Sequence, residues 1–262
     1  MRAAAAFALC LLAVRAAACE ISPADETAYP GSVVTDAETR GAIARAWFDA
    51  PVARYRHFVL SRDSEPEALW VDAPGNHGNC GHRIVLDDAH VFEDVAPRLV
   101  DLDGDGTNEV IVVRSHAGQG AQLAVYRWTG RDLVLDAATP YIGRPHRWLA
   151  PVGAADLDGD GAMELAYVDR PHLARILRVW RYAPGRLTEV AAARGLSNHR
   201  IGESAITGGV RDCGAGPEMV TADAAWEHVI VTRLEAGRLV SRRAGPFDGA
   251  GSVGAVMACK TR

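Results

Sequence analysis

Short runs of β-branched, aliphatic and aromatic residues recur along the chain, and turns rich in Gly, Pro and Asp separate them. Such runs, each bounded by turn residues, are typical of β-strands. The clearest of them lie at 110–113, 123–128, 165–168 and 177–182. The 26 Gly and 13 Pro residues and an aromatic content of 6% also favour many turns over long helices. The pattern therefore predicts an all-β protein.

The strand pattern repeats with a period of about 54 residues. The segment DLDGDGTNE at 101–109 recurs as DLDGDGAME at 156–164, and a third copy reads VRDCGAGPE at 210–218. An apolar run and then a second run follow each copy, as in LAVYRW at 123–128 and LRVWRY at 177–182. Each unit thus predicts four short strands, with repeats at about 98–140, 152–196 and 205–240.

A four-stranded unit that repeats several times is the sequence form of a β-propeller blade. The segments 53–60, 68–73 and 82–88 predict three further strands, and 252–259 predicts one at the C-terminus. We expect the two ends to combine into a fourth blade that closes a small propeller. The alternative is a fifth blade from residues 20–50, although 36–48 is more typical of a short helix.

The N-terminus has the pattern of a secretory signal peptide, with a basic start, an apolar run and small residues before Cys19. The apolar run is too short to span a membrane, and no later segment is long and apolar enough. Residues 1–18 are therefore predicted to be removed, leaving one domain at 19–262 in the periplasm or outside the cell. Lipid anchoring at Cys19 is the less favoured alternative, because Ala16 stands where such signals carry Leu or Val.

Export makes disulfides the expected state of the remaining cysteines, which are Cys19, Cys80, Cys213 and Cys259. Cys213 and Cys259 both follow predicted inner strands of adjacent blades, so a bond between them would fasten the C-terminal strand. Cys19 and Cys80 are the residual pair, and the partner of Cys80 stays open. The net charge of −5 without a basic run excludes a typical nucleic-acid binder.

The two complete acidic loops have the chemistry of calcium sites. Carboxylates at loop positions 1, 3, 5 and 9, with a backbone carbonyl at position 7, supply the oxygen ligands that calcium prefers. Magnesium is less suited, because it demands octahedral geometry with few protein ligands. A solvated acidic turn is the alternative for a single copy. The third copy has Val210 and Gly214 at ligand positions and is predicted to be metal-free.

These loops resemble those of the FG-GAP/VCBS repeat family, the calcium-loop propellers related to the integrin alpha-chain head. Small exported proteobacterial VCBS-repeat proteins are the nearest likeness. The resemblance covers about 98–239 and implies a secreted β-propeller with calcium in two loops and a binding role. The Phe-Gly element of the family is missing. The residues carried over as calcium ligands are Asp101, Asp103, Asp105, Thr107, Glu109, Asp156, Asp158, Asp160, Ala162 and Glu164.

Several histidines share a place in the repeat, in loops that should lie opposite the acidic loops. With neighbouring arginines they form a candidate ligand face for an anion, a sugar acid or a transition metal. The alternative is that they hydrogen-bond loop backbones and recur because the blades are duplicated. The residues of this face are His90, His116, Arg144, His146, Arg147, His172, His199 and Arg200.

The chain lacks the linear motifs of metalloproteases, serine hydrolases and P-loop enzymes. The sequence therefore predicts a secreted, calcium-stabilised binding module, not an enzyme, whose partner is an unidentified protein or a small-molecule or carbohydrate ligand. One alternative is a propeller-type hydrolase or lyase that uses His, Arg and carboxylate residues at the channel mouth. Another is a structural module of an envelope complex.

Overall fold

The computed structural model describes residues 27–36, 43–75 and 78–260, without the side chains of 74, 75 and 78–80. The predicted signal peptide, Cys19 and the side chain of Cys80 lie outside this description. Among the described residues, no helix has the length and apolar character needed to cross a membrane.

The described chain is almost entirely antiparallel β-structure and forms four sheets of four or five strands. This confirms the predicted all-β class and agrees with a small β-propeller of about four blades. The first sheet follows a short 3₁₀ helix, η2 (Pro30–Ser32), and consists of β1 (Val34–Thr35), β2 (Arg45–Val52), β3 (Glu65–Gly75) and β4 (Gly78–Val85).

The other three sheets arise from the repeated part of the chain. The second contains β5 (His90–Phe92), β6 (Arg98–Val100), β7 (Glu109–His116), β8 (Gly120–Trp128) and β9 (Leu133–Ala138). The third contains β10 (Leu149–Ala155), β11 (Glu164–Asp169), β12 (Ile176–Ala183) and β13 (Arg186–Arg194). The fourth contains β14 (Leu196–Ser197), β15 (Gly209–Asp212), β16 (Pro217–Asp223), β17 (His228–Glu235) and β18 (Arg238–Pro246).

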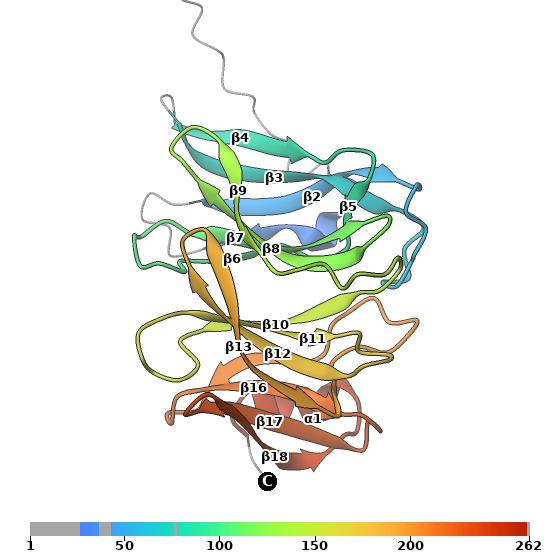
Figure 1. Cartoon of the computed structure of the whole chain (residues 1–262), viewed down its shortest axis with the longest axis vertical. Helices are drawn as coiled ribbons and strands as arrows, with labels where there is room; N and C mark the ends of the chain where they lie inside the picture. Colours follow the sequence, from blue (N-terminus) through green and yellow to red (C-terminus); the bar gives the residue numbers. More distant parts are fainter. Residues whose placement is uncertain (1–26, 37–42, 76–77, 261–262) are drawn as a thin grey trace, which may run out of the picture.

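The sheets are held together by apolar faces on both sides of their strands. Along β7, Val110 and Val112 pack toward the first sheet, whereas Ile111 and Val113 pack toward the third. Successive side chains of a strand point to opposite faces, so an uninterrupted apolar run is buried twice. Figure 1 shows the result: the four sheets follow one another in chain order along the longest axis, with the first and fourth at opposite ends.

The predicted closure by terminal strands is wrong. Residues 250–257 form a helix, α1 (Ala250–Met257), and the first sheet takes all of its strands from the N-terminal part of the chain. The short segment AGSVGAVM carries its two buried residues, Val253 and Val256, three positions apart, which places them on one helical face. They pack on Val220, Val229 and Val231, so α1 covers the outer face of the fourth sheet.

Two details of the first sheet also differ from the expectation. Residues 45–52 form strand β2, where a short helix over 36–48 was predicted, and the predicted strand over 53–60 is a loop. Two residues of this segment, Arg56 and Phe58, and the following Ser61 have φ near +55°. Left-handed backbone at non-glycine residues is incompatible with a strand.

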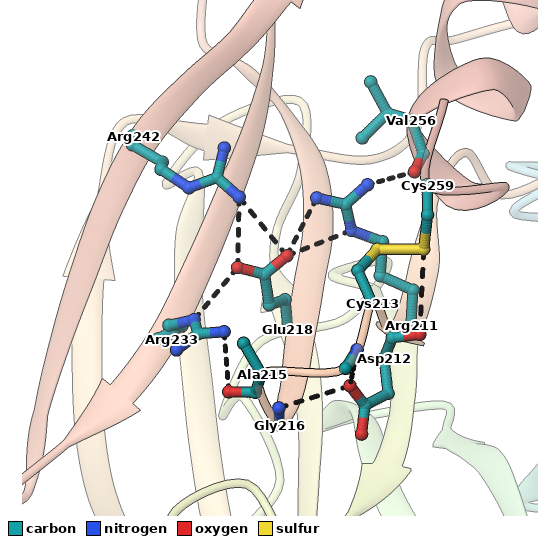
Figure 2. Close-up of a disulfide and its surroundings, with 11 residues drawn as sticks. Arg211, Asp212, Cys213, Ala215, Gly216, Glu218, Arg233, Arg242, Val256 and Cys259 are labelled. Carbon is teal, nitrogen blue, oxygen red and sulfur yellow. Dashed lines mark hydrogen bonds and ion pairs between the residues drawn. A yellow bond between two sulfur atoms is a disulfide. The ribbon is translucent and has the colours of Figure 1, made fainter. Parts of the chain in front are cut away.

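The predicted Cys213–Cys259 disulfide is present, although it fastens a helix in place of the expected strand. Cys213 follows β15 and Cys259 follows α1 by two residues, so the bond ties α1 to the edge of the fourth sheet (Figure 2). It joins positions 46 residues apart in the sequence, a separation at which a disulfide removes about 4 kcal/mol of loop entropy from the unfolded chain.

We expect the double variant Cys213→Ser/Cys259→Ser to lose about 2–4 kcal/mol of unfolding free energy in urea denaturation. Reduction of the wild-type protein should cause a similar loss, whereas the reductant should leave the variant unchanged. Equal stability of the variant and the oxidised wild type would show that the bond does not hold α1 in place.

Candidate functional site

The two acidic loops lie at equivalent places, between β6 and β7 and between β10 and β11. Each turns through two glycines with positive φ, which are Gly104 at +77° and Gly106 at +85° in the first loop. Residues that carry a side chain rarely adopt this backbone conformation, so glycine is strongly favoured there. In both loops, the carboxylates of positions 1, 3 and 9 bring ligand oxygens within 4.8 Å of one another. The predicted convergence of four carboxylates is thus present for positions 1, 3 and 9 but not for position 5.

The carboxylate at position 1 also organises the loop backbone. Asp101 accepts hydrogen bonds from the N–H groups of Gly104 and Gly106, at 2.8 and 3.0 Å. Asp156 does the same for Gly159 and Gly161, at 2.8 and 3.0 Å. Position 5 faces its own turn, since Asp105 accepts from the N–H of Thr107, and it lies outside the closest oxygen group. The turn conformation is thus built by the loop itself.

The glutamate at position 9 of each loop is the first residue of a buried strand. In the first loop this residue is Glu109, which is 2% exposed and accepts a hydrogen bond from the N–H of Leu102. Burial raises the pKa of Glu109 to about 7, and the negative charges of Asp103, Asp105 and Asp101 act in the same direction. Among the described residues, Glu109 has no ion pair with a basic side chain. The first loop therefore concentrates negative charge, and no basic side chain of the described segments pairs with Glu109 there.

The carboxylates of the second loop are paired with an arginine of the protein itself. Arg181 on β12 pairs with Asp158 at 2.6 Å, with Asp160 at 2.8 Å and with Glu164 at 2.6 Å. Burial raises the pKa of Glu164, and the Arg181 guanidinium opposes that rise. The equivalent residue of the preceding sheet, Arg127, pairs with Asp136 at 3.0 Å and does not enter the first loop. The two loops thus have nearly the same sequence but different charge compensation.

In the third copy, arginines surround the residue at position 9, Glu218 (Figure 2). Arg211 pairs with it at 2.8 Å inside the protein, and Arg233 and Arg242 pair with it at 2.9 and 3.1 Å. Arg211 also donates to the carbonyl of Val256 at the end of α1. Burial would raise the pKa of Glu218, but these guanidinium groups lower it below its usual value.

A further group of possible metal ligands, Asp223, Glu227 and His228, gathers at the turn between β16 and β17. Asp223 accepts from the N–H of Glu227 at 2.9 Å and from Nδ1 of His228 at 2.9 Å. These hydrogen bonds within the turn explain why the three side chains lie close together.

Part of the predicted ligand face lines one pocket of about 220 Å³. His146, Arg147 and His172 come together there, at the end of the strands opposite the acidic loops. His199 lies behind His172 and is 1% exposed. The complete lining is His57, Val59, His146, Arg147, Trp148, Arg170, Pro171, His172, Leu173 and Ile201.

The other predicted residues of that face lie elsewhere. His90 and His116 contact each other with ring centroids 4.8 Å apart, and His90 Nε2 bonds to the Tyr141 hydroxyl at 2.9 Å. Arg144 is exposed outside the pocket lining. Arg200 stacks over the rings of Trp226 and Phe247 at 4.4 and 4.7 Å, so it packs against the fourth sheet.

Sequence reasoning missed His57 and Arg170 in this pocket, and Glu93 behind it. His57 lies in the loop that was predicted to be a strand, and its Nδ1 is 2.5 Å from the Glu93 carboxylate. Glu93 is 2% exposed and also accepts from the hydroxyl of Ser115 at 2.6 Å. His57 has no equivalent in the repeats, so periodicity carried no signal for it. Arg170 directly follows β11, beside the predicted His172.

Residues 101–167 match the FG-GAP-like repeat family, which confirms the expected resemblance for this segment. The match covers about a quarter of the chain and includes both acidic loops. No curated protein matches the chain significantly.

The contrast around Glu218 can be tested with a matched pair of variants. We expect Arg211→Met to lower the free energy of unfolding by about 3 kcal/mol, because it removes the buried partner of a buried carboxylate. Arg242→Met should cost less than about 1 kcal/mol, since the Arg242 side chain is 54% exposed. Urea denaturation would measure both, and an equal loss would contradict a special role for Arg211.

Proposed function

With an FG-GAP-like repeat at residues 101–167, we propose that this protein is an exported, calcium-stabilised β-propeller-type binding module. The main support for calcium binding is the uncompensated negative charge of the carboxylates in the first loop. Asp101, Asp103 and Glu109 bring oxygens within 4.8 Å of one another, and the buried Glu109 has no basic partner within the described ranges. Taking an ionised carboxylate out of water is costly unless a cation or hydrogen-bond donors neutralise it.

The donor set fits calcium. All side chains of the cluster offer carboxylate oxygen, and the backbone carbonyl of Thr107 would add a neutral oxygen of the kind that calcium also takes. Bound calcium would supply positive charge at the start of β7. Asp101, Asp103, Asp105, Thr107 and Glu109 would hold it in the first loop, and Asp156, Asp158, Asp160, Ala162 and Glu164 in the second.

The binding role is supported by the pocket at the other end of the strands. Strands that pack on both faces present their loops with little ordering cost when a ligand binds. His146, Arg147 and His172 converge on a concave space there, as expected of a small-molecule site. The Cys213–Cys259 disulfide supports an oxidising compartment and hence export.

Calcium should raise the thermal stability of the protein. At one hundred times its Kd, calcium adds about 2.7 kcal/mol to the unfolding free energy for each site. Asp103→Asn should remove the contribution of the first loop without changing the shape of the side chain. The control is Asp212→Asn in the third copy, which should respond to calcium like the wild type. Melting curves that are identical in EDTA and in calcium would contradict the proposal.

Arg181 should weaken calcium binding at the second loop, because its guanidinium already neutralises the ligands. We expect calorimetric titration of the wild type to resolve a tight and a weak site. Arg181→Met should tighten the weak site by about tenfold or more, since it removes several charge-assisted hydrogen bonds that calcium must displace.

Arg127→Met is the matched control, because Arg127 occupies the same repeat position but pairs with Asp136 outside the loop. It should leave both calcium affinities unchanged. In EDTA, Arg181→Met should also be less stable than the wild type, since Glu164 then lacks a cation. Two equal sites in the wild type would contradict the assigned role of Arg181.

A further inference from the structure

The pocket at the ends of β10 and β11 presents positive charge. Arg147 and Arg170 are in its lining, and no Asp or Glu is among the lining residues. The guanidinium of Arg147 donates to the neighbouring carbonyl of His146 at 2.8 Å and forms no ion pair with a described carboxylate. The Asp169 carboxylate accepts hydrogen bonds from Nε and one terminal nitrogen of Arg170, at 2.8 and 3.0 Å. The second terminal nitrogen of Arg170 has no partner among the described residues.

Hydrogen bonds fix the proton on His172, one of the three histidines in the lining, through His199 behind it. A backbone carbonyl only accepts, so Nε2 of His199 donates to the Glu203 carbonyl at 2.9 Å. Nδ1 of His199 is then an acceptor, and Nε2 of His172 donates to it at 2.8 Å. Burial, together with His199, His57 and Arg175, lowers the pKa of His172 to about 4. At neutral pH, Nδ1 of His172 therefore offers a lone pair.

The other two histidines are anchored in the same way. Nε2 of His146 donates to the carbonyl of Tyr55 at 3.0 Å, so in the neutral ring Nδ1 is the acceptor. Nδ1 of His57 donates to the Glu93 carboxylate at 2.5 Å, so Nε2 is the ring nitrogen of His57 that is left for a ligand. The rings of His57 and His146 stack with centroids 5.3 Å apart. The lining thus combines guanidinium donors with three imidazole rings. In each ring, one nitrogen is occupied by a hydrogen bond within the protein and the other is left for a ligand.

The backbone around the pocket is strained. Arg56 and Phe58 flank His57 with φ near +55°, and His146 and Arg170 in the lining have φ of +52° and +46°. Non-glycine residues in this region are energetically costly and gather at binding and catalytic sites. The rim adds apolar surface, because Leu173 and Ile201 are 64% and 81% exposed. Exposed side chains of this size beside a polar cavity suit the C–H face of a ligand.

We propose that this pocket binds a small hydroxylated carboxylate of the sugar-acid class. The carboxylate would accept from Arg147 and Arg170, and the hydroxyl groups would donate to His172, His146 and His57. The apolar rim would contact the C–H face of the ring. The inference rests on the proposed binding function and specifies its site and ligand class.

Two other ligand classes fit less well. An inorganic anion has acceptors for the arginines but offers no donors to the imidazole nitrogens. A transition metal needs several ligand atoms close together, yet no three described His, Cys, Asp or Glu residues of the pocket bring their ligand atoms within 4.8 Å of one another. A cation would also lie beside the unpaired Arg147.

The probe is D-glucuronate, titrated into the calcium-loaded protein and followed by NMR and calorimetry. D-glucose shares the hydroxyl groups without the carboxylate, and cyclohexanecarboxylate shares the charge and ring without the hydroxyl groups. We expect glucuronate to bind at least tenfold more tightly than either analogue. Arg147→Gln and His172→Phe should each weaken glucuronate binding at least tenfold.

Matched controls come from the same predicted face. Arg144→Gln lies on the loop of Arg147 but outside the lining, and His116→Phe lies in a separate cluster. Both should bind glucuronate within twofold of the wild type. Circular dichroism and the calcium-induced shift in melting temperature check that each variant is folded.

The outcomes separate the inference from the proposed function. Glucose, cyclohexanecarboxylate or inorganic phosphate binding as tightly as glucuronate would overturn the ligand class, and so would zinc binding that is lost in His172→Phe. No binding of glucuronate to a protein that calcium still stabilises would overturn the inference and leave the calcium proposal intact. Glucuronate binding without any effect of calcium would refute the calcium proposal alone.

Discussion

The structure depends on the neutralisation of a buried carboxylate at the start of the second strand in each repeat. Glu109, Glu164 and Glu218 are all less than 4% exposed, and each begins or closely follows the start of a strand in the centre of its sheet. A buried negative charge is costly unless a positive group or several donors face it. The third repeat meets this constraint by surrounding Glu218 with arginines and the second by inserting Arg181, whereas Glu109 of the first has no basic partner among the described residues. The position-9 glutamate is thus constant while its counter-charge varies.

The stacking of the sheets sets a second constraint, because each blade-type sheet exposes apolar residues on both faces. Inner sheets cover each other, as the alternating contacts of β7 and β11 show. No further sheet follows the fourth within the described part of the chain, and α1 covers its outer face through Val253 and Val256. Arg211 connects this cap to the charge cluster, since it bonds both Glu218 and the Val256 carbonyl. The eroded third loop and the C-terminal helix therefore form one structural unit, which the Cys213–Cys259 disulfide encloses (Figure 2).

Local and periodic features could be read from the sequence, whereas features that depend on distant partners could not. The loops at 101–109 and 156–164 could be predicted because glycine and carboxylate positions there are dictated within nine residues and occur twice. The helix at 250–257 was missed because a short run of small and apolar residues favours strand and helix about equally, and only the exposed face of the fourth sheet decides. His57 was missed because its place depends on Glu93 and on the left-handed residues of its own loop. The shared location of His146 and His172 followed from their repeat positions.

The acidic loops and the pocket lie at opposite ends of the same strands, and this makes the loops relevant to the pocket. Strand β11 runs from Glu164 at the second acidic loop to Asp169, which holds the guanidinium of Arg170 in the pocket. Six residues of extended chain span only about 20 Å, and β11 is hydrogen-bonded on both sides and buried along its length. Glu164, which Arg181 compensates, and Asp169, which orients Arg170, are the two ends of this one buried strand, so the second acidic loop and the pocket share a structural element.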